Sequence, residues 1–323
     1  MTTQNTKIGV VKMLGLDNNN EERTVENVFE DFINYCEVKN LSKQTIKYYK
    51  NQFKIFSRFY DTENLIGDIK QSNTYSYILH LKKNHDINET TVNTYLRALR
   101  AFLYYAMENG ELEKFKIEMI KTEEKIKKTY TDQELEKLLN KPDLEECTFA
   151  HYRNWVVVNF LLGTGCRSKT LLNVKIEDLR FEDGFVLFRK AKNRKQQLIP
   201  LSRTLNSVLK EYLRYRKGEG KDYLFCTERG QKLTRAGLRS AIKRYNTSKG
   251  LSKTSIHLFR HTFAKKWILN NGDPYRLQKI LGHSSMEIVR RYVNMFSEDL
   301  KKDFNSFNPL EEFNNSGEHI KIY

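Results

Sequence analysis

The chain has 323 residues, which is long enough for about two domains with separate hydrophobic cores. Its 39% hydrophobic and 30% charged residues are typical of a globular protein and exclude low-complexity disorder. No apolar run approaches the roughly 18 residues of a membrane span, and the N-terminus lacks the apolar core of a signal peptide. Four scattered cysteines without a CxxC motif favour neither disulfides nor a thiolate zinc site, so we expect a cytoplasmic protein with no membrane partner.

The chain carries 56 lysines and arginines against 40 acidic residues, a formal net charge of +16. Residues 1–112 hold 14 basic and 14 acidic residues, so the whole excess lies in residues 113–323. A field of one sign favours a polyanionic partner, because lysine and arginine displace counterions from phosphates. No basic amphipathic helix with a Trp/Leu face is evident, which favours nucleic acid over an anionic membrane.

The N-terminal third reads as helices that follow a polar segment. Residues 1–23 are expected to form a flexible arm, and residues 24–112 a helical domain. Thr24 and Ser42 are suitable N-caps for the first two helices, and a third is expected near 90–108. The residues of the third helix expected to face inward are Val92, Tyr95, Leu99, Phe102 and Leu103.

The second of these helices carries two stripes at helical spacing. The apolar stripe is Ile46, Tyr49, Phe53, Phe56 and Tyr60, and the basic stripe is Lys43, Lys47, Lys50, Lys54 and Arg58. A solvated helix face normally mixes charges of both signs, so a stripe of one sign indicates contact with DNA. Arg97 on the third helix is a further DNA-binding candidate. An ordinary solvated face is the alternative.

Residues 113–128 are highly charged and are expected to form a partly helical linker between domains. A second domain of α+β type is then expected over 129–308, with a tail over 309–323. It would open with a capping box from Thr131 to Glu134, followed by an apolar helix over 150–162 that ends at Gly163. Three short strands are expected next: Leu179–Phe181, Phe185–Lys190 and Gln197–Leu201. From residue 203 onward we expect mainly helices. The predicted fold is therefore mainly α with a small antiparallel β-sheet, in two domains.

Single motifs in the second domain are weak on their own. Gly163–Thr164–Gly165 resembles part of a phosphate loop, but no GK[ST] sequence completes it. His257 and His261 have the spacing of a zinc pair, yet the HExxH glutamate is missing and Arg260 lies between them, so no metal site is expected. His257 and Arg260 lie on one helical face, because they are three residues apart.

Four motifs together carry a resemblance. GTGCRSKTLLNVKIEDL, FRKAKNRKQQLIPL, HLFRHTFA and LGHSSMEIVRRYVNM occur in this order across residues 163–295. In order and spacing they resemble the tyrosine recombinase (phage integrase, Xer-like) family, and the likeness covers about 24–308. It implies a helical core DNA-binding domain followed by a catalytic domain.

The resemblance also implies roles for individual residues. The catalytic set that it gives is Arg167, Lys192, His257, Arg260 and His283, with Tyr292 as the nucleophile. Lys190 and Lys195 lie close to Lys192 and are alternatives for the hairpin lysine. Thr170 stands where family members commonly carry an acidic residue three positions after the first arginine.

The chemistry gives an independent reason for these residue types. A tyrosine oxygen that attacks a DNA phosphodiester makes a phosphorane with added negative charge, and two arginines can hold its nonbridging oxygens. A lysine can protonate the leaving 5′-oxygen, and a histidine can accept the tyrosine proton. The 3′-phosphotyrosine intermediate conserves the bond energy, so no ATP, metal or other cofactor is expected.

We therefore expect a site-specific DNA recombinase that integrates or excises a mobile element or resolves DNA multimers. Its partners would be double-stranded DNA with inverted-repeat sites and three further copies of the chain, in a homo-tetramer. The alternatives are a type IB topoisomerase and a non-catalytic DNA-binding protein. A terminal helix is expected to begin at Ser297–Leu300 and to dock its aromatic surface on its own catalytic domain or on a neighbouring subunit. The residues of this surface are Phe304, Phe307, Leu310 and Phe313.

Overall fold

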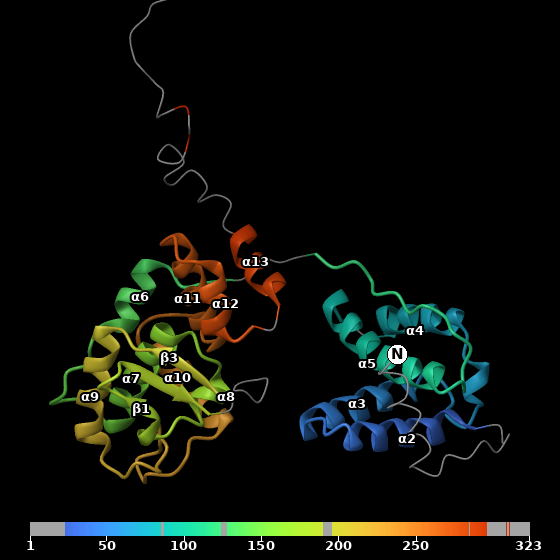
Figure 1. The fold of residues 1–323 in the computed structure, drawn as a ribbon, viewed down its shortest axis with the longest axis horizontal. Helices are drawn as coiled ribbons and strands as arrows, with labels where there is room; N and C mark the ends of the chain where they lie inside the picture. Colours follow the sequence, from blue (N-terminus) through green and yellow to red (C-terminus); the bar gives the residue numbers. More distant parts are fainter. Residues whose placement is uncertain are drawn as a thin grey trace, which may run out of the picture. The chain divides into compact units, whose positions relative to one another are not determined.

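The computed structural model describes residues 23–84, 87–123, 128–189, 196–283 and 285–295, together with Asn308 and Leu310. It divides the chain into two compact units, Met1–Glu124 and Lys125–Tyr323 (Figure 1). The predicted fold class is confirmed, since the described elements are helices apart from one three-stranded antiparallel sheet. No helix in the described ranges is long and apolar enough to cross a membrane.

Three expectations fall on other parts of the chain. The N-terminal arm before Arg23, the hairpin loop 190–195 and the aromatic tail all lie outside the described residues, apart from Asn308 and Leu310.

Up to Glu108, the described residues of the first unit form α-helices with one short 3₁₀ turn at Ile66–Asp68. The helices are α2 (Val25–Val38), α3 (Lys43–Phe56), α4 (Gln71–Asn84) and α5 (Glu89–Glu108). Both predicted N-caps are confirmed, because Thr24 accepts from the Asn27 backbone N–H and Ser42 from that of Thr45. Helix α4 was not predicted, because polar residues fill its first turns and separate the apolar positions Tyr77 and Leu81 that it buries.

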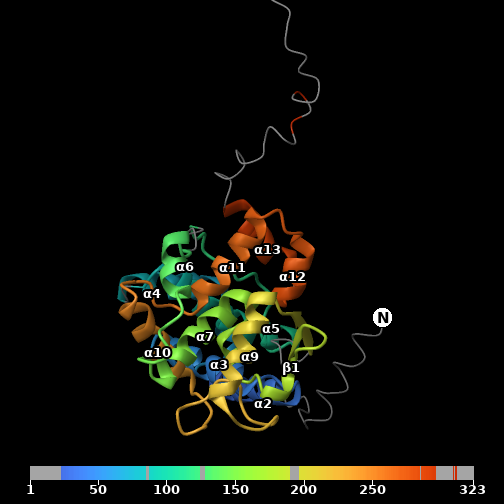
Figure 2. The same ribbon diagram turned by 90° about the vertical axis from the view of Figure 1, so that its left-hand side faces the viewer.

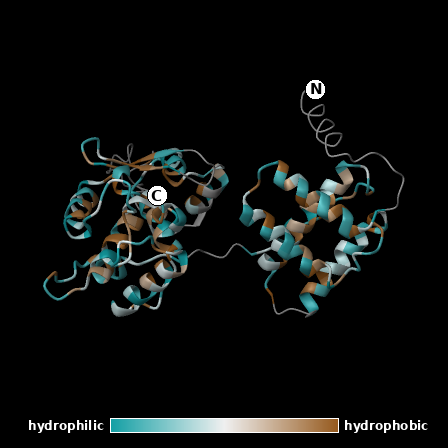
Figure 3. Ribbon diagram, turned by 90° about the horizontal axis from the view of Figure 1, so that it is seen from below, coloured by the Kyte–Doolittle hydropathy of each residue, from teal (hydrophilic) through white to brown (hydrophobic). Residues whose placement is uncertain are grey.

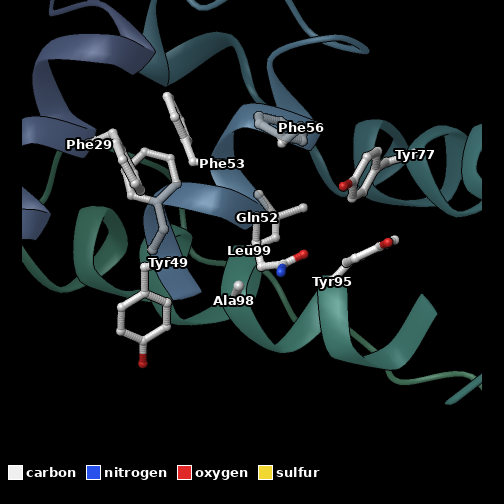
Figure 4. Close-up of a pocket in the computed structure, with 10 residues that line it drawn as sticks. Phe29, Tyr49, Gln52, Phe53, Phe56, Tyr77, Tyr95, Ala98 and Leu99 are labelled. Carbon is white, nitrogen blue, oxygen red and sulfur yellow. The ribbon is translucent and has the colours of Figure 1, made fainter. Parts of the chain in front are cut away.

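An aromatic core fixes α3 against α2 and α5. Phe29 and Phe53 stack with their ring centroids 3.6 Å apart, and Phe102 meets both rings edge-on. These rings line a small cavity that also contains Gln52 (Figure 4). Hydrophobic and hydrophilic positions alternate along the helices of the unit (Figure 3). Burial of Phe53 and Phe56 therefore leaves the opposite face of α3 to solvent.

The expected linker over 113–128 needs correction in its first part. Residues 113–123 form no helix, and Ile117 is buried in the core of the first unit. Asn93 exchanges two hydrogen bonds with the Ile120 backbone, of 2.8 and 3.0 Å. The cause is a period of two in KFKIEMI: Phe115, Ile117 and Met119 face the unit, while the charged residues between them face outward.

The second unit places its sheet and most of its helices around α7 (Phe149–Thr164) (Figures 1 and 2). The other helices are α6 (Asp132–Leu139), α8 (Ser168–Leu171), α9 (Arg203–Arg216), α10 (Arg235–Ser248), α11 (His257–Leu269), α12 (Pro274–Leu281) and α13 (Met286–Met295), with a 3₁₀ turn at Ile176–Asp178. The strands β1 (Leu179–Arg180), β2 (Phe185–Phe188) and β3 (Gln197–Pro200) pair in sequence order. The predicted capping box at the start of α6 is confirmed.

The end of α7 differs from the prediction. The helix continues through Gly163, whose backbone packs against Leu205, and ends at Thr164. Gly165 then adopts a left-handed conformation with φ of 60° and forms the C-cap. This turn delivers Arg167 to the N-cap position of α8. The shape of the chain at Gly165 therefore sets where the first candidate arginine lies.

We predict that Gly165→Ala destabilises the second unit more than an ordinary left-handed glycine substitution. An added Cβ would lie 2.6 Å from Phe263 Cδ1 and 2.8 Å from Leu281 Cδ2. Overpacking and left-handed strain together should lower the free energy of unfolding by about 2–4 kcal/mol. Gly184→Ala is the control, because it has φ of 71° and no atom within 4 Å of the new Cβ. It should cost about 1–2 kcal/mol.

Urea unfolding followed by tryptophan fluorescence measures the free energy of unfolding of the second unit alone, since both tryptophans of the chain, Trp155 and Trp267, belong to this unit. Equal losses of unfolding free energy in Gly165→Ala and Gly184→Ala would contradict the predicted steric contact.

Candidate active site

Two arginines from separate elements meet at the carboxyl end of α12. Arg260 donates through Nη2 to the Leu281 carbonyl at 2.7 Å and through Nη1 to the Gly165 carbonyl at 2.9 Å. Arg167 Nη1 reaches the same Leu281 oxygen at 3.3 Å. The last carbonyls of a helix lack intrahelical partners and attract cations. The ends of α7 and α12 thus hold both guanidinium groups side by side.

The two guanidinium groups are strongly desolvated. Arg260 is 6% exposed, and burial together with the neighbouring Arg167 lowers its pKa to about 10. Burial also lowers the pKa of Arg167. Both stay protonated at neutral pH, and neither forms a salt bridge with a carboxylate in the described part of the chain. Two adjacent cations without an acidic partner form a site for an anion with several oxygens, such as a phosphate.

His257 opens α11, one turn before Arg260. Desolvation lowers its pKa, and so do the positive charges of Arg235, Arg260, Arg167 and Arg239, so its ring is neutral at pH 7. Arg235 and Arg239 are exposed on α10 and were missed by the sequence analysis. Their spacing of four residues, continued at Lys243, is the signal that marks a basic face there.

His283 follows the left-handed Gly282 that caps α12. Its Nε2 lies 2.6 Å from Arg260 Nη2 and accepts from that guanidinium N–H. Its ring is parallel to the Tyr292 ring, with centroids 6.4 Å apart. The turn after α12 therefore brings the second histidine between the arginine and the tyrosine.

Tyr292 lies on α13 and is almost enclosed, with 5% of its surface exposed. Its ring belongs to a small apolar cluster with Ala264, Leu277, Leu281 and Val289. Burial raises the pKa of its hydroxyl, whereas the charges of Arg260 and Arg167 act to lower it. Its hydroxyl oxygen is 2.8 Å from His261 Nδ1. In the sequence His261 has only the spacing of a zinc ligand, and nothing in its motif indicates a contact with Tyr292.

The remaining candidates stand as follows. Lys192 and its alternatives Lys190 and Lys195 lie outside the described residues. The strand that follows them is tied to the site, since Gln197 Nε2 donates to the Ile280 carbonyl at 3.0 Å. Thr170 is half-buried on α8. Within the described ranges no group of three or more His, Cys, Asp or Glu side chains is placed to hold a metal ion.

The basic stripe of the first unit is fully on the surface, as all five of its residues are exposed. Lys50 and Lys54 border a groove that Glu26 and Glu30 of α2 also line, so this end of the stripe carries both signs. Tyr48 ties α3 to α5 by donating to the Thr94 carbonyl at 2.5 Å. Arg97 is exposed on α5, within electrostatic range of Tyr48. The structure therefore places Arg97 beside α3.

Comparisons with known proteins identify families and relatives that this chain resembles. The phage integrase family matches residues 128–298, and the phage integrase N-terminal SAM-like domain matches residues 28–115. Tyrosine recombinase XerD of Listeria innocua is 27% identical, over 88% of this chain and 99% of the relative. Tyrosine recombinase XerA of Pyrococcus furiosus is 30% identical, over 90% of this chain and 97% of the relative.

Two solved structures share the fold. The Tn1549 transposon integrase, in complex with a circular intermediate DNA, superposes with a TM-score of 0.68 at 20% identity and covers 85% of this chain and 99% of its own. The XerH site-specific recombinase bound to palindromic difH DNA gives 0.65 at 23% identity, with 89% and 90% covered. With its catalytic and SAM-like regions both matched, the chain belongs to the phage integrase family of tyrosine recombinases.

Proposed function

We propose that this chain is a site-specific recombinase whose Tyr292 attacks a DNA phosphodiester and forms a 3′-phosphotyrosine. Tyrosine recombinases break and rejoin DNA strands, and the chain is an enzyme of this kind. One observation supports the residue assignment above the others: Arg167, Arg260, His283 and Tyr292 come from four separate segments and meet at the end of α12.

In the proposed mechanism the two arginines bind the nonbridging oxygens of the scissile phosphate. Each guanidinium carries five N–H donors, so N–H groups other than those that donate to the Leu281 carbonyl would bind these oxygens. Charged donors in a desolvated site stabilise the developing negative charge more strongly than donors in water. His257, whose pKa is lowered, and His283, which contacts Arg260 through Nε2, add ring nitrogens at the edge of the same site.

The covalent step is a transesterification. A bond forms between the Tyr292 oxygen and phosphorus, and the bond from phosphorus to the 5′-oxygen breaks. The proton of the Tyr292 hydroxyl passes to a histidine of the site. The leaving 5′-oxygen takes a proton, which we assign to Lys192, with Lys190 and Lys195 as alternatives. Attack by a 5′-hydroxyl on the phosphotyrosine reverses the step and rejoins the strand, so the proposed reaction consumes no ATP and needs no metal ion.

We propose double-stranded DNA with inverted-repeat sites as the partner. XerH is bound to a palindromic site and the Tn1549 integrase to a circular intermediate DNA, which supports a substrate of this type. Exchange between two sites cuts four strands, so four copies of the chain are required. We place this reaction in the cytoplasm, where the DNA of a mobile element or a chromosome would be its substrate.

Relaxation of supercoils by a type IB topoisomerase would use similar chemistry. The match to the phage integrase SAM-like domain and the Xer relatives favours recombination. Incubation of the chain with two DNA sites tests this, since strand exchange between them is expected of a recombinase and not of a topoisomerase.

Tyr292→Phe should abolish covalent protein–DNA adducts and leave DNA binding nearly unchanged, because only the nucleophilic oxygen is lost. The substrate is a nicked duplex carrying the site that the wild-type chain selects from a random-sequence pool. Adducts are measured on denaturing gels, and Tyr275→Phe is the control, since Tyr275 is exposed on α12. Adducts in the Tyr292→Phe variant would show that another residue is the nucleophile.

Arg260→Lys should slow cleavage by about 100-fold or more, because a single ammonium cannot replace two carbonyl contacts and a phosphate clamp. Arg276→Lys is the matched control, as Arg276 is exposed on α12. The cleavage rate is measured under single turnover at saturating protein, and tryptophan fluorescence checks that the variant is folded. A rate within a few-fold of wild type would remove Arg260 from the phosphate site.

Reversal of Lys47, Lys50 and Lys54 to Glu should weaken DNA binding and flatten its salt dependence. Each lost phosphate contact lowers the slope of log K against log salt by about 0.9. Reversal of Lys39, Lys82 and Lys83 changes the net charge equally at exposed positions off the stripe. Equal slopes in the two triple variants, measured on random duplex DNA, would make the stripe an ordinary solvated face.

A further inference from the structure

His261 is the one histidine of α11 that the proposed mechanism does not use. It follows Arg260 directly and lies one turn after His257. Its Nδ1 is 2.8 Å from the Tyr292 hydroxyl oxygen, and the two rings lie 5.8 Å apart at 45°. The contact joins α11 to α13 across 31 residues of sequence. It therefore acts on the same oxygen atom that the proposed reaction requires.

Among the described residues, the other neighbours of Tyr292 confine its ring. Ala264, Leu277 and Val289 are fully buried neighbours in the same apolar cluster, and their side chains offer no hydrogen bond. His283 is parallel to the ring, and its Nε2 is engaged by Arg260. A buried ring needs a directional contact to orient its hydroxyl oxygen as a nucleophile. Misplacement of that oxygen by about 1 Å can slow the reaction 100-fold.

We propose that His261 is a positioning residue for the nucleophile: its Nδ1 accepts the Tyr292 hydroxyl hydrogen and aims the oxygen at the phosphate held by Arg167 and Arg260. This inference rests on the proposed role of Tyr292. The hydroxyl lies within electrostatic range of both guanidinium groups, so the hydrogen bond to His261 holds the hydroxyl oxygen beside the phosphate site. The ring hydrogen of His261 is then on Nε2.

The geometry offers a matched pair of variants. In His261→Asn the side-chain amide occupies the place of the imidazole Nδ1, whereas the longer side chain of His261→Gln carries its amide to the place of Nε2. His261→Leu keeps the bulk and removes every acceptor. His261 is only partly buried, so polar replacements fit the site. The asparagine variant should therefore keep the hydrogen bond that positions the Tyr292 hydroxyl, and the glutamine and leucine variants should lose it.

The test measures single-turnover adduct formation on the selected nicked duplex at saturating protein. We expect His261→Leu and His261→Gln to slow cleavage by about 100-fold with unchanged DNA affinity. His261→Asn should stay close to the wild-type rate. A purely structural role would not separate the asparagine variant from the glutamine variant, since both side chains are polar and differ by one methylene.

Other outcomes overturn the proposal. Equal losses in all three variants would reduce His261 to packing, and wild-type rates in the glutamine and leucine variants would remove it from the reaction. Faster cleavage by His261→Leu would make the contact a restraint on Tyr292. If Tyr292→Phe still forms adducts, the assignment of the nucleophile fails instead, which separates the two proposals. Tryptophan fluorescence confirms the fold of each variant, and the comparison of asparagine with glutamine decides the matter if the leucine variant does not fold.

Discussion

The buried guanidinium of Arg260 is the contact on which the rest of the site depends. It bridges the carbonyl oxygens of Gly165 and Leu281 and so fastens the end of α7 to the end of α12. Its third partner is His283, on the turn that leads to α13. An unpaired charge with 6% exposure would be costly, so these three acceptors are a condition of the fold as well as of the chemistry. Stability and function share one side chain here.

Much of the site was predicted from the sequence, because four motifs in order resemble the tyrosine recombinase family, and phosphoryl transfer gives an independent reason for the residue types. Arg167, Arg260, His283 and Tyr292 were predicted and meet in the structure. His261 was missed, since its task is a contact with a residue 31 positions away, and no local pattern encodes it. Tertiary contacts between helices decide such roles.

In the fold, too, features with a local sequence pattern were predicted and features that depend on tertiary packing were not. Amphipathic helices with strong caps were predicted, whereas α4 was missed because its apolar positions Tyr77 and Leu81 are separated by polar residues. The segment around Ile117 reads as charged linker, yet its alternating apolar residues complete the core of the first unit. The end of α7 was misplaced by two residues, since the sequence offers both Gly163 and Gly165 as a left-handed cap and the structure uses Gly165.

The way the arginines are held preserves their attraction for phosphate. A carboxylate partner would neutralise the guanidinium charge, but backbone carbonyls supply only dipoles. No carboxylate of the described chain contributes to the pKa of Arg167 or Arg260. Thr170, three residues after Arg167, adds no negative charge where family members commonly carry an acid. The site therefore keeps two neighbouring positive charges. A phosphorane carries more negative charge than the phosphodiester and so relieves their repulsion more strongly.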